Sequence, residues 1–440
     1  MIEELKVKIE DKEGNYYFYF PTVNLVLPVG ILNKKGSFYL KLKVFLEKRR
    51  TIGINDAPSK KTIQKDLANV RKCLFEVSEA CNLRCRYCIF SGKFIDRREH
   101  TKRIMGWKIA KKSFDFFCNW IIRNENMHIN PYVGSLGFYG GEPLTNFSLI
   151  QDIVEYSKRQ VSIKSKKFPF KFNYDITTNG LLLNEEKISY LIDNGFRIVL
   201  SIDGPAPIHE KNKGKGTFDV LMNIIKYIHA KYPLYYKRNI GFSVVYVRDT
   251  DLLKIRDFFS QKIFEDAKKI SFGRVVTNFS SLKYPEEGLN ENKAYELIKE
   301  SKRRGKKLNK IEEAIIREYF RLSWNTLIYK NESNYGAFCN LGSKTMYFGT
   351  DGNIHGCEKV GKSFIIGNIY KGIYLDKLLK LANEWREKTK FCGNCKVQSM
   401  CIACLATTGI ENKIKLSGLC SELKRNFEEK VSEYIEYEKI

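Results

Sequence analysis

Residues 73–275 alternate between short apolar runs and amphipathic stretches, and this alternation constrains the fold more than any other feature of the chain. The apolar runs predict strands at 73–77, 135–139, 172–177, 197–202, 241–247 and 270–272. The stretches between them predict helices near 106–124, 148–160, 185–194, 217–230 and 250–260. Strands joined by helices pair in parallel through right-handed crossovers. The sequence therefore predicts an α/β fold with a partial (βα)6, TIM-like barrel, whose site lies beyond the carboxyl ends of its strands.

An N-terminal extension, residues 1–72, is expected to be rich in β-structure. Strands at 5–9 and 16–20 flank a turn signal at 12–15, which is the pattern of a hairpin. Two further strands are expected, at 23–29 and 38–45.

The C-terminal part of the chain divides into two regions. Residues 276–338 read as a helical bridge. Residues 339–440 hold seven cysteines and little regular periodicity, which predicts a small domain built around metal rather than around its own apolar core. An amphipathic helix is expected to follow Ser421 and to cap the molecule.

The chain is strongly basic, with 76 Lys and Arg against 50 Asp and Glu, a formal charge of +26. Such a balance suits a polyanion or an acidic peptide, although lysines spread along the whole chain also fit a compositional bias. No RNA-binding module or aromatic-rich basic stripe is evident, so a nucleic-acid partner is not expected.

Targeting signals are not evident either. The N-terminus lacks the features of a signal peptide, and no apolar run approaches the ~18 residues of a membrane span. A cytoplasmic protein without a membrane partner is expected. In that compartment, twelve cysteines indicate metal binding or catalysis rather than disulfides.

The first group of cysteines, Cys81, Cys85 and Cys88, follows the first predicted barrel strand. Three thiolates at this spacing can bind three irons of a cubane and leave the fourth iron open. A structural zinc ion needs four ligands, and no fourth His or Cys lies in this short run. The run therefore predicts a [4Fe–4S] cluster with an open iron.

This motif, with the aromatic Tyr87 before its last cysteine, resembles that of the radical S-adenosylmethionine (SAM) superfamily. The resemblance continues through Gly-Gly-Glu-Pro at 140–143, Thr-Thr-Asn-Gly at 177–180 and Ser-Ile-Asp-Gly-Pro at 201–205, each following a predicted strand. It covers about residues 73–275. It implies that catalytic cysteines 81, 85 and 88 hold a cluster that cleaves SAM to methionine and a 5′-deoxyadenosyl radical.

The resemblance also implies a set of SAM-binding residues: Tyr87, Gly140, Gly141, Glu142, Asn179, Ser201, Asp203, Lys213 and Val245. The glycines would let the backbone approach the ligand closely, and Glu142 would pair with its ammonium group. Ser201 would bond ribose or carboxylate oxygens. Related enzymes often place an arginine downstream for the carboxylate. Residues 209–213 contain none, so Lys213 is expected to replace it as a point charge.

The C-terminal cysteines form a second constellation. Cys392, Cys395, Cys401 and Cys404 are spaced as in a metal site, and one zinc ion on these four is the simplest interpretation. It leaves three cysteines unexplained. The ordered set, with Gly352 five residues before Cys357, resembles the SPASM domain, a twin-cluster extension of radical enzymes that mostly act on peptides. That resemblance implies an outer [4Fe–4S] cluster on Cys392, Cys395, Cys401 and Cys420, and an inner one on Cys339, Cys357 and Cys404. Cys73 and Cys118 then remain as small buried hydrophobes.

The inner cluster lacks a fourth cysteine in this interpretation. Either a residue other than cysteine fills that position, or an iron stays open and could bind a substrate thiolate. The second option favours a peptide that contains cysteine. Glu358 occupies the position of a catalytic base in sulfatase maturases, although a surface glutamate beside Lys359 is an equal alternative.

The sequence thus predicts a radical SAM peptide maturase that joins a Cys sulfur to a carbon, with three [4Fe–4S] clusters. Alternatives are a sulfatase maturase, a maturase that forms carbon–carbon cross-links, an RNA-modifying radical enzyme and a non-catalytic electron carrier. Expected partners are a precursor peptide with an acidic leader and a low-potential donor such as ferredoxin or flavodoxin. A monomer is expected, and residues 1–72 either bind the leader as an added strand or are a bare extension.

Overall fold

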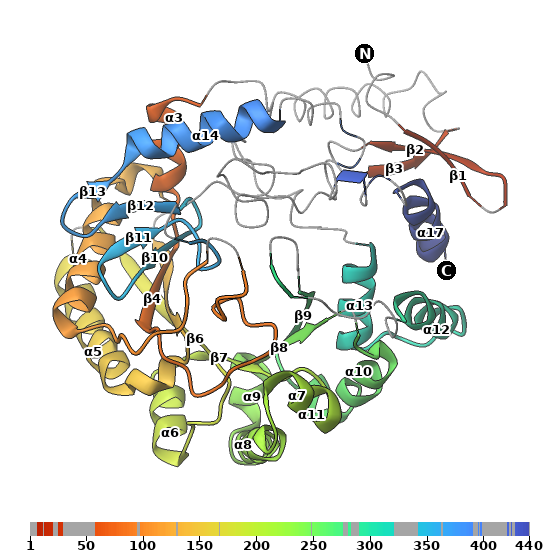
Figure 1. Cartoon of the computed structure of the whole chain (residues 1–440), viewed down its shortest axis with the longest axis horizontal. Coiled ribbons are helices and arrows are strands. Elements are labelled where there is room, and N and C mark those ends of the chain that lie inside the picture. Colours follow the sequence, from red (N-terminus) through yellow and green to blue (C-terminus); the bar gives the residue numbers. More distant parts are fainter. Residues whose placement is uncertain are drawn as a thin grey trace.

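One ten-stranded sheet organises most of the computed structural model (Figure 1), in the order β13-β12-β11-β10-β4-β5-β6-β7-β8-β9. The structure describes residues 7–11, 13–20, 25–29, 58–94, 97–128, 131–166, 168–247, 249–275, 280–282, 290–320, 342–361, 364–389, 395, 397, 420–421, 424 and 427–439. Within these ranges, no helix combines the length and the apolar character needed to cross a bilayer.

Six neighbouring strands of this sheet run parallel and form the barrel wall. They are β4 (Lys72–Ser78), β5 (Tyr132–Gly140), β6 (Phe170–Thr178), β7 (Arg197–Ser201), β8 (Ile240–Tyr246) and β9 (Lys269–Arg274). All six predicted strands are confirmed, and so is the partial barrel that they build. Aromatic side chains in register join neighbouring strands, as between Phe75 and Phe138, whose ring centroids are 5.8 Å apart.

Helices on the outside of the barrel cover the strands (Figure 1). The predicted ones are confirmed as α4 (Trp107–Arg123), α5 (Phe147–Lys164), α6 (Glu185–Asp193), α8 (Thr217–Lys231) and α10 (Leu252–Phe259). Four more were not predicted: α3 (Lys60–Ala68), α7 (Ala206–Lys213), α9 (Pro233–Asn239) and α11 (Lys262–Glu265). These four have at most nine residues each, so they show too few turns for a helical period to stand out. Short 3₁₀ turns, η2 (Glu125–Met127) and η3 (Pro143–Asn146), complete this part.

The other edge of the sheet is built from the C-terminal part of the chain. There β10 (Thr345–Phe348) pairs in parallel with β4, and β11 (Asn353–His355), β12 (Ile365–Asn368) and β13 (Gly372–Ile373) continue antiparallel. The helix α14 (Leu375–Thr389) follows. The apolar side chains of this region, among them Met346, Phe348, Ile366 and Trp385, lie in the same buried cluster as the barrel core.

The region was expected not to have an apolar core of its own, and in the described residues 342–361 and 364–389 its apolar side chains pack into the core of the barrel. Their strands have two to four residues each, too short to show alternation in the sequence, and the barrel supplies the surface on which they pack. The domain boundary placed at residue 339 stays a prediction.

The two ends of the chain pack together beside the barrel (Figure 1). The N-terminal hairpin is confirmed, with β1 (Val7–Glu10), β2 (Tyr16–Phe20) and β3 (Leu25–Pro28) antiparallel. The expected C-terminal helix is α17 (Phe427–Lys439), and a second small core joins Ile9 and Tyr19 to it.

The bridge between the barrel and the C-terminal strands contains two described helices, α12 (Glu291–Arg303) and α13 (Lys310–Phe320). Lys299 of α12 pairs with Glu436 of α17 at 3.0 Å. The strand expected at 38–45 lies outside the described residues.

Candidate active site at the carboxyl ends of the strands

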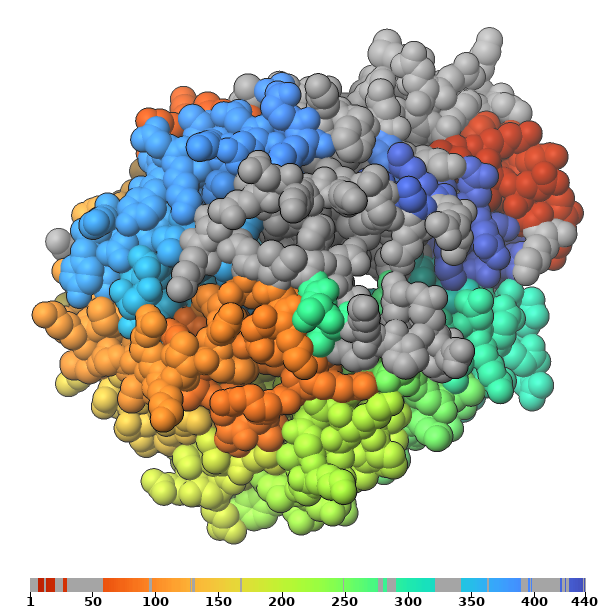
Figure 2. Space-filling view, in the orientation of Figure 1, coloured from red at the N-terminus to blue at the C-terminus, as the bar shows by residue number. Residues whose placement is uncertain are grey.

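Cys81, Cys85 and Cys88 lie in the loop that leaves the carboxyl end of β4. Hydrogen bonds hold this loop at both sides: the amide of Glu79 donates to the Arg103 carbonyl at 2.9 Å, and the amide of Cys88 donates to the Cys85 carbonyl at 3.0 Å. The orange segment that contains the loop reaches the surface between the blue C-terminal elements and the yellow-green barrel helices (Figure 2). The three thiols thus lie together at the mouth of the barrel.

The three thiols suit an iron–sulfur cluster better than a single ion. Burial raises the pKa of each thiol, and burial together with the charges of Cys85 and Cys81 raises the pKa of Cys88 to about 11. Deprotonation therefore needs a cationic centre, which cluster irons supply. Among the described residues, no three His, Cys, Asp or Glu side chains converge on one point as ligands of a single ion. A cubane, in which each thiolate binds a different iron, fits this spacing.

An imidazole not predicted from the sequence contacts the third cysteine. Nε2 of His100 lies 3.3 Å from Sγ of Cys88, and its Nδ1 lies 3.2 Å from the Glu79 carbonyl oxygen. Hydrogen bonds to cluster sulfurs tune the reduction potential of the cluster. His100 follows Cys88 by twelve residues, and no spacing rule connects the two.

The glycines of the 140–143 segment are required by the chain itself. At Gly140 φ is +136°, and a Cβ there would lie 2.1 Å from the Ser78 carbonyl oxygen. A Cβ at Gly141 would lie 2.2 Å from the Ala80 carbonyl oxygen. The amide of Gly141 donates to Ser78 at 2.7 Å, so the end of β5 runs directly against the segment that leads into the cysteine loop.

Glu142 joins the end of β5 to the end of β6. It is 1% exposed, and its carboxylate accepts from the Thr178 hydroxyl at 2.6 Å and from the amides of Asn179 and Leu144 at 2.8 and 3.1 Å. Burial raises its pKa, against the lowering effect of these hydrogen bonds. A carboxylate has about four acceptor positions, so roughly one remains for a ligand. The Asn179 side chain in turn donates to Asn82 of the cysteine loop at 2.8 Å.

Asp203 is fully buried and binds the motif aromatic. Its Oδ2 accepts from the Tyr87 hydroxyl at 2.7 Å and from Asn212 at 3.0 Å, and its Oδ1 accepts from the Val245 amide at 3.4 Å. The ammonium group of Lys213 lies 3.9 Å from Oδ1 and 5.5 Å from the centre of the Tyr87 ring. Lys213 therefore already has an anionic partner in the chain.

Ser201 lies half-buried at the end of β7, opposite Ser243 of β8. It therefore stands at the same rim of the barrel as the cysteine loop.

A salt bridge that no sequence signal predicts fastens the cysteine loop to the far side of the barrel. Arg86 makes two hydrogen bonds to Asp249, at 2.6 and 3.1 Å, and one to Asn212 at 2.6 Å. Lys211 donates to the same carboxylate at 2.8 Å. Burial alone would raise the pKa of Asp249, but the hydrogen bonds from Arg86 and Lys211 outweigh it and lower that pKa.

The turn after β11 brings Cys357 and Glu358 to the barrel. Sγ of Cys357 lies 3.5 Å from Oε2 of Glu358. The side chain of Arg98, nearly buried, donates to the Glu358 carbonyl at 2.6 Å and to the Glu76 carboxylate on β4 at 2.6 Å. This guanidinium thereby connects the barrel strand that precedes the first cysteine group to the turn that carries Cys357.

Tyr139, at the end of β5, lies near members of both cysteine groups. Burial raises the pKa of its phenol, and the charges of Glu358, Cys88 and Cys357 raise it further. Groups from both cysteine groups therefore lie near one phenol at the end of β5. Cys357 and the first three cysteines come from segments more than 250 residues apart in the chain.

The remaining cysteines fall into three sets. Cys395 and Cys420 lie near each other, since burial and then the charge of Cys395 raise the pKa of Cys420. Cys73 and Cys118 are buried in the core as predicted. Four others, Cys339, Cys392, Cys401 and Cys404, lie outside the described residues.

Comparison with known families supports the resemblance of the first cysteine motif. Residues 75–246 match the family model described as the Radical SAM superfamily, and this range includes the first three cysteines, Glu142 and Ser201.

Two curated proteins illustrate the extent of the similarity. The radical SAM cyclopropyl synthase TigE of Paramaledivibacter caminithermalis is 25% identical over 385 residues, which cover 83% of this chain and 72% of TigE. A cysteine-type anaerobic sulfatase-maturating enzyme of Clostridium perfringens is 25% identical over 197 residues, 43% of this chain and 48% of that enzyme. The chain thus spans about half of the sulfatase-maturating enzyme.

Solved structures share the fold. Native anSMEcpe with bound AdoMet superimposes with a TM-score of 0.58 at 19% identity, covering 82% of this chain and 98% of that one. SuiB of Streptococcus suis, bound to the precursor peptide SuiA, superimposes with a TM-score of 0.51 at 17% identity, covering 93% and 96%. At these identities the likeness shows a common fold.

Proposed function

Residues 75–246 form a radical SAM domain, and on that premise we propose that the chain is a radical SAM maturase that joins a cysteine sulfur to a carbon within a ribosomally made peptide. The observation that carries this proposal is that Cys88 of the first cysteine group and Cys357 both lie near the phenol of Tyr139. A site that generates a radical and a site that could bind a thiolate would then face the same stretch of peptide.

The radical SAM family implies a [4Fe–4S] cluster and SAM, which when bound supply a 5′-deoxyadenosyl radical. Cys81, Cys85 and Cys88 would hold that cluster. The remaining acceptor position of Glu142 suits an ammonium group, and Ser201 lies at the same rim. Lys213 is held by Asp203, so it would offer a ligand carboxylate only part of its charge.

Two auxiliary clusters complete the proposal. Cys339, Cys357 and Cys404 would hold an inner cluster with one open iron, and Cys392, Cys395, Cys401 and Cys420 would hold an outer one. The proximity of Cys395 and Cys420 supports the second set. The open position would bind the thiolate of the substrate cysteine.

Formation of a thioether removes one hydrogen atom from a peptide carbon, one proton from the thiol and one electron. The 5′-deoxyadenosyl radical would take the hydrogen atom, and the proposed inner and outer clusters would take the electron. Glu358 is the proposed acceptor of the proton of the substrate thiol. Its carboxylate lies 3.5 Å from Sγ of Cys357, one of the proposed ligands of the inner cluster to which that thiol would bind. Arg98 would fix that carboxylate by holding the backbone carbonyl of the same residue. The proposed electron partner is a low-potential protein such as ferredoxin or flavodoxin, and the proposed enzyme is a monomer.

A peptide substrate is supported by the shared fold with SuiB, whose solved complex contains a precursor peptide. The name of the sulfatase-maturating relatives also points to polypeptide substrates. The match to a cyclopropyl synthase over 83% of this chain favours a second candidate, a maturase that forms a carbon–carbon bond.

Anaerobic incubation of the reconstituted enzyme with SAM, a reductant and the peptide encoded beside its gene tests these candidates. Mass spectrometry before and after thiol alkylation is the readout. A loss of two hydrogens with one fewer alkylatable thiol supports the thioether. The same mass loss with every thiol still alkylatable refutes it and supports the carbon–carbon product. An unmodified peptide, with SAM cleaved, refutes both.

A further inference from the structure

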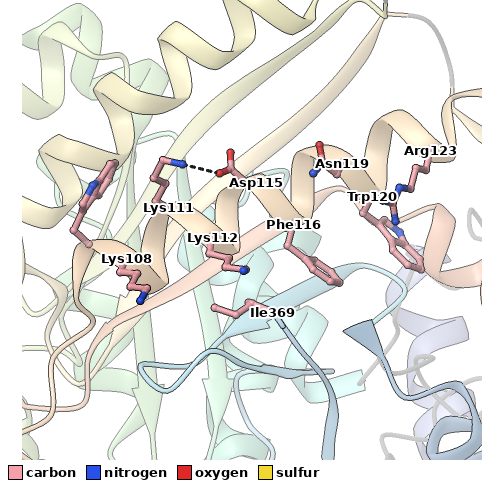
Figure 3. A pocket seen from close by; sticks show the side chains of 10 residues that line it. Lys108, Lys111, Lys112, Asp115, Phe116, Asn119, Trp120, Arg123 and Ile369 are labelled. Atoms are coloured by element: carbon pink, nitrogen blue, oxygen red, sulfur yellow. Dashed lines mark hydrogen bonds and ion pairs between the residues drawn. The ribbon is translucent and has the colours of Figure 1, made fainter. Parts of the chain in front are cut away.

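A groove runs along the outer face of α4, where the turn between β12 and β13 lies against that helix. Its volume is about 540 Å³, and its lining residues are Trp107, Lys108, Lys111, Lys112, Asp115, Phe116, Asn119, Trp120, Arg123 and Ile369. Figure 3 shows Lys108, Lys112 and Phe116 on the side of α4 that faces Ile369. The groove is thus lined by a basic and aromatic stripe that the sequence did not reveal, because its members are spread over seventeen residues of one helix and one distant turn.

The charge of the groove is one-sided. Its lining carries four cations and a single carboxylate, Asp115. That carboxylate is already engaged, since it pairs with Lys111 at 3.2 Å and accepts from the Tyr156 hydroxyl at 2.8 Å. Lys108 and Arg123 are exposed, and within the described part of the chain no carboxylate lies at ion-pair distance from either.

The floor of the groove is apolar and firmly held. The rings of Phe116 and Trp120 stack with centroids 6.3 Å apart and an interplanar angle of 9°. The indole N–H of Trp120 donates to the Leu67 carbonyl at 3.0 Å, and an edge of Phe116 packs on Phe348. The ring faces used in this stack are closed to a nucleobase, which leaves fewer stacking surfaces for a single-stranded nucleic acid.

We propose that this groove binds an acidic segment of the substrate peptide, its leader, with carboxylates on the Lys and Arg side chains and apolar side chains on the aromatic floor. The proposal rests on the proposed function, since it takes a peptide as the substrate. From Lys108 to Arg123 the helix rises about 22 Å. An extended peptide covers that length in roughly seven residues.

The position of α4 supports a leader rather than an electron donor. The amide of Met105, just before the helix, donates to the Val77 carbonyl of β4 at 3.0 Å, so the groove begins at the rim that carries the cysteine loop. The opposite face of the helix packs on the sheet through Phe114 and Phe117. An electron-donor protein bound in the groove would be separated from the cysteines by α4 and the sheet. A leader can bind there, because it is connected to the modified segment of the same peptide by the intervening chain.

Equilibrium binding to the full-length reconstituted enzyme tests the proposal. The probes are a fluorescein-labelled 12-residue peptide of alternating Glu and Leu, the same peptide with Gln for Glu, and a 12-nucleotide RNA. The Glu peptide should bind, and the Gln peptide should bind at least about tenfold more weakly. Reversing three charges, as Lys108→Glu/Lys112→Glu/Arg123→Glu, should weaken binding of the Glu peptide at least about tenfold.

A matched triple variant, Lys226→Glu/Arg238→Glu/Lys293→Glu, changes the net charge equally on three exposed sites away from the groove. It should bind the Glu peptide within about twofold of the native enzyme. If the reversed groove variant does not fold, Lys108→Gln/Lys112→Gln/Arg123→Gln replaces it, with a loss of about threefold or more expected.

Three results would overturn the proposal. They are native affinity in the groove variants, an equal loss in both triple variants, and RNA that binds more tightly than the Glu peptide and is released by the groove substitutions. Binding is measured without turnover, so the binding assay can be interpreted even if the proposed thioether reaction does not occur. In the same way, a failure of the Glu peptide to bind would not contradict the proposed reaction.

Discussion

Replacement of Arg98 by Met should destabilise the protein, because the buried carboxylate of Glu76 loses its cationic partner. This carboxylate is 4% exposed and receives a 2.6 Å hydrogen bond from Arg98, whose guanidinium also lies 4.3 Å from the centre of the Tyr347 ring. Removing one partner of a buried ion pair costs about 3–5 kcal/mol, because the other charge stays buried. The midpoint of urea unfolding of the reconstituted enzyme measures the loss.

The double variant Arg98→Met/Glu76→Gln removes both charges and should recover most of that stability. It should not recover peptide modification, because the hydrogen bond from Arg98 to the Glu358 carbonyl stays absent. Activity and stability should thus separate in this one comparison, with the Arg98→Met and Glu76→Gln single variants as controls. Additive losses in the double variant would contradict the reasoning, and so would full modification activity.

The cost of Arg98→Met should also depend on pH. Burial already raises the pKa of Glu76, and the guanidinium opposes that rise. Without Arg98 the folded-state pKa rises further, while the unfolded-state pKa stays near 4.5. A raised acid pKa favours the folded state at low pH, and that advantage is lost as pH climbs through the folded-state value. The destabilisation should therefore be smaller at pH 5 than at pH 8; equal losses would refute this origin.

Other substitutions test separate parts of the site. Gly141→Ala places a methyl group 2.2 Å from a backbone oxygen, so peptide-independent SAM cleavage should fall at least about 100-fold, and wild-type rates would contradict the packing argument. Thr178→Val removes a 2.6 Å hydrogen bond to the Glu142 carboxylate and should raise the KM for SAM about tenfold; an unchanged KM would show that Glu142 needs no such support. Cys81→Ala should abolish SAM cleavage and lower the iron content by about four per chain, whereas the buried Cys118→Ala should keep both.

The barrel could be predicted from the sequence because its helices and strands are long enough to display their periods. The same reasoning missed several short elements, and it also missed α14, a helix of 15 residues in the region expected to lack regular periodicity. Helix α7 and the strands β10–β13 show no period, and their burial is decided by the surface of the barrel. The packing of residues after 342 on the barrel was not predicted for this reason.

The candidate site could be predicted as a set of motifs, but not as a set of contacts. The spacing of the first three cysteines and the Gly-Gly-Glu-Pro segment are local signals. The contacts that connect them join distant segments: Arg86 with Asp249, and Arg98 with Glu358. The need for glycine at position 140 also comes from a contact between distant segments. A Cβ at Gly140 would collide with the backbone at the end of β4, which is close in space but far away in the sequence.

The central claim is that radical chemistry begun at the first cysteine group ends on a thiol of the peptide. The most direct measurement uses a precursor peptide deuterated at the carbons of its candidate acceptor residues, in a single anaerobic turnover with SAM and reductant. The expected result is one deuterium in 5′-deoxyadenosine and one fewer alkylatable thiol in each modified peptide. Deuterium-free 5′-deoxyadenosine, or a modified peptide with every thiol still alkylatable, would contradict it.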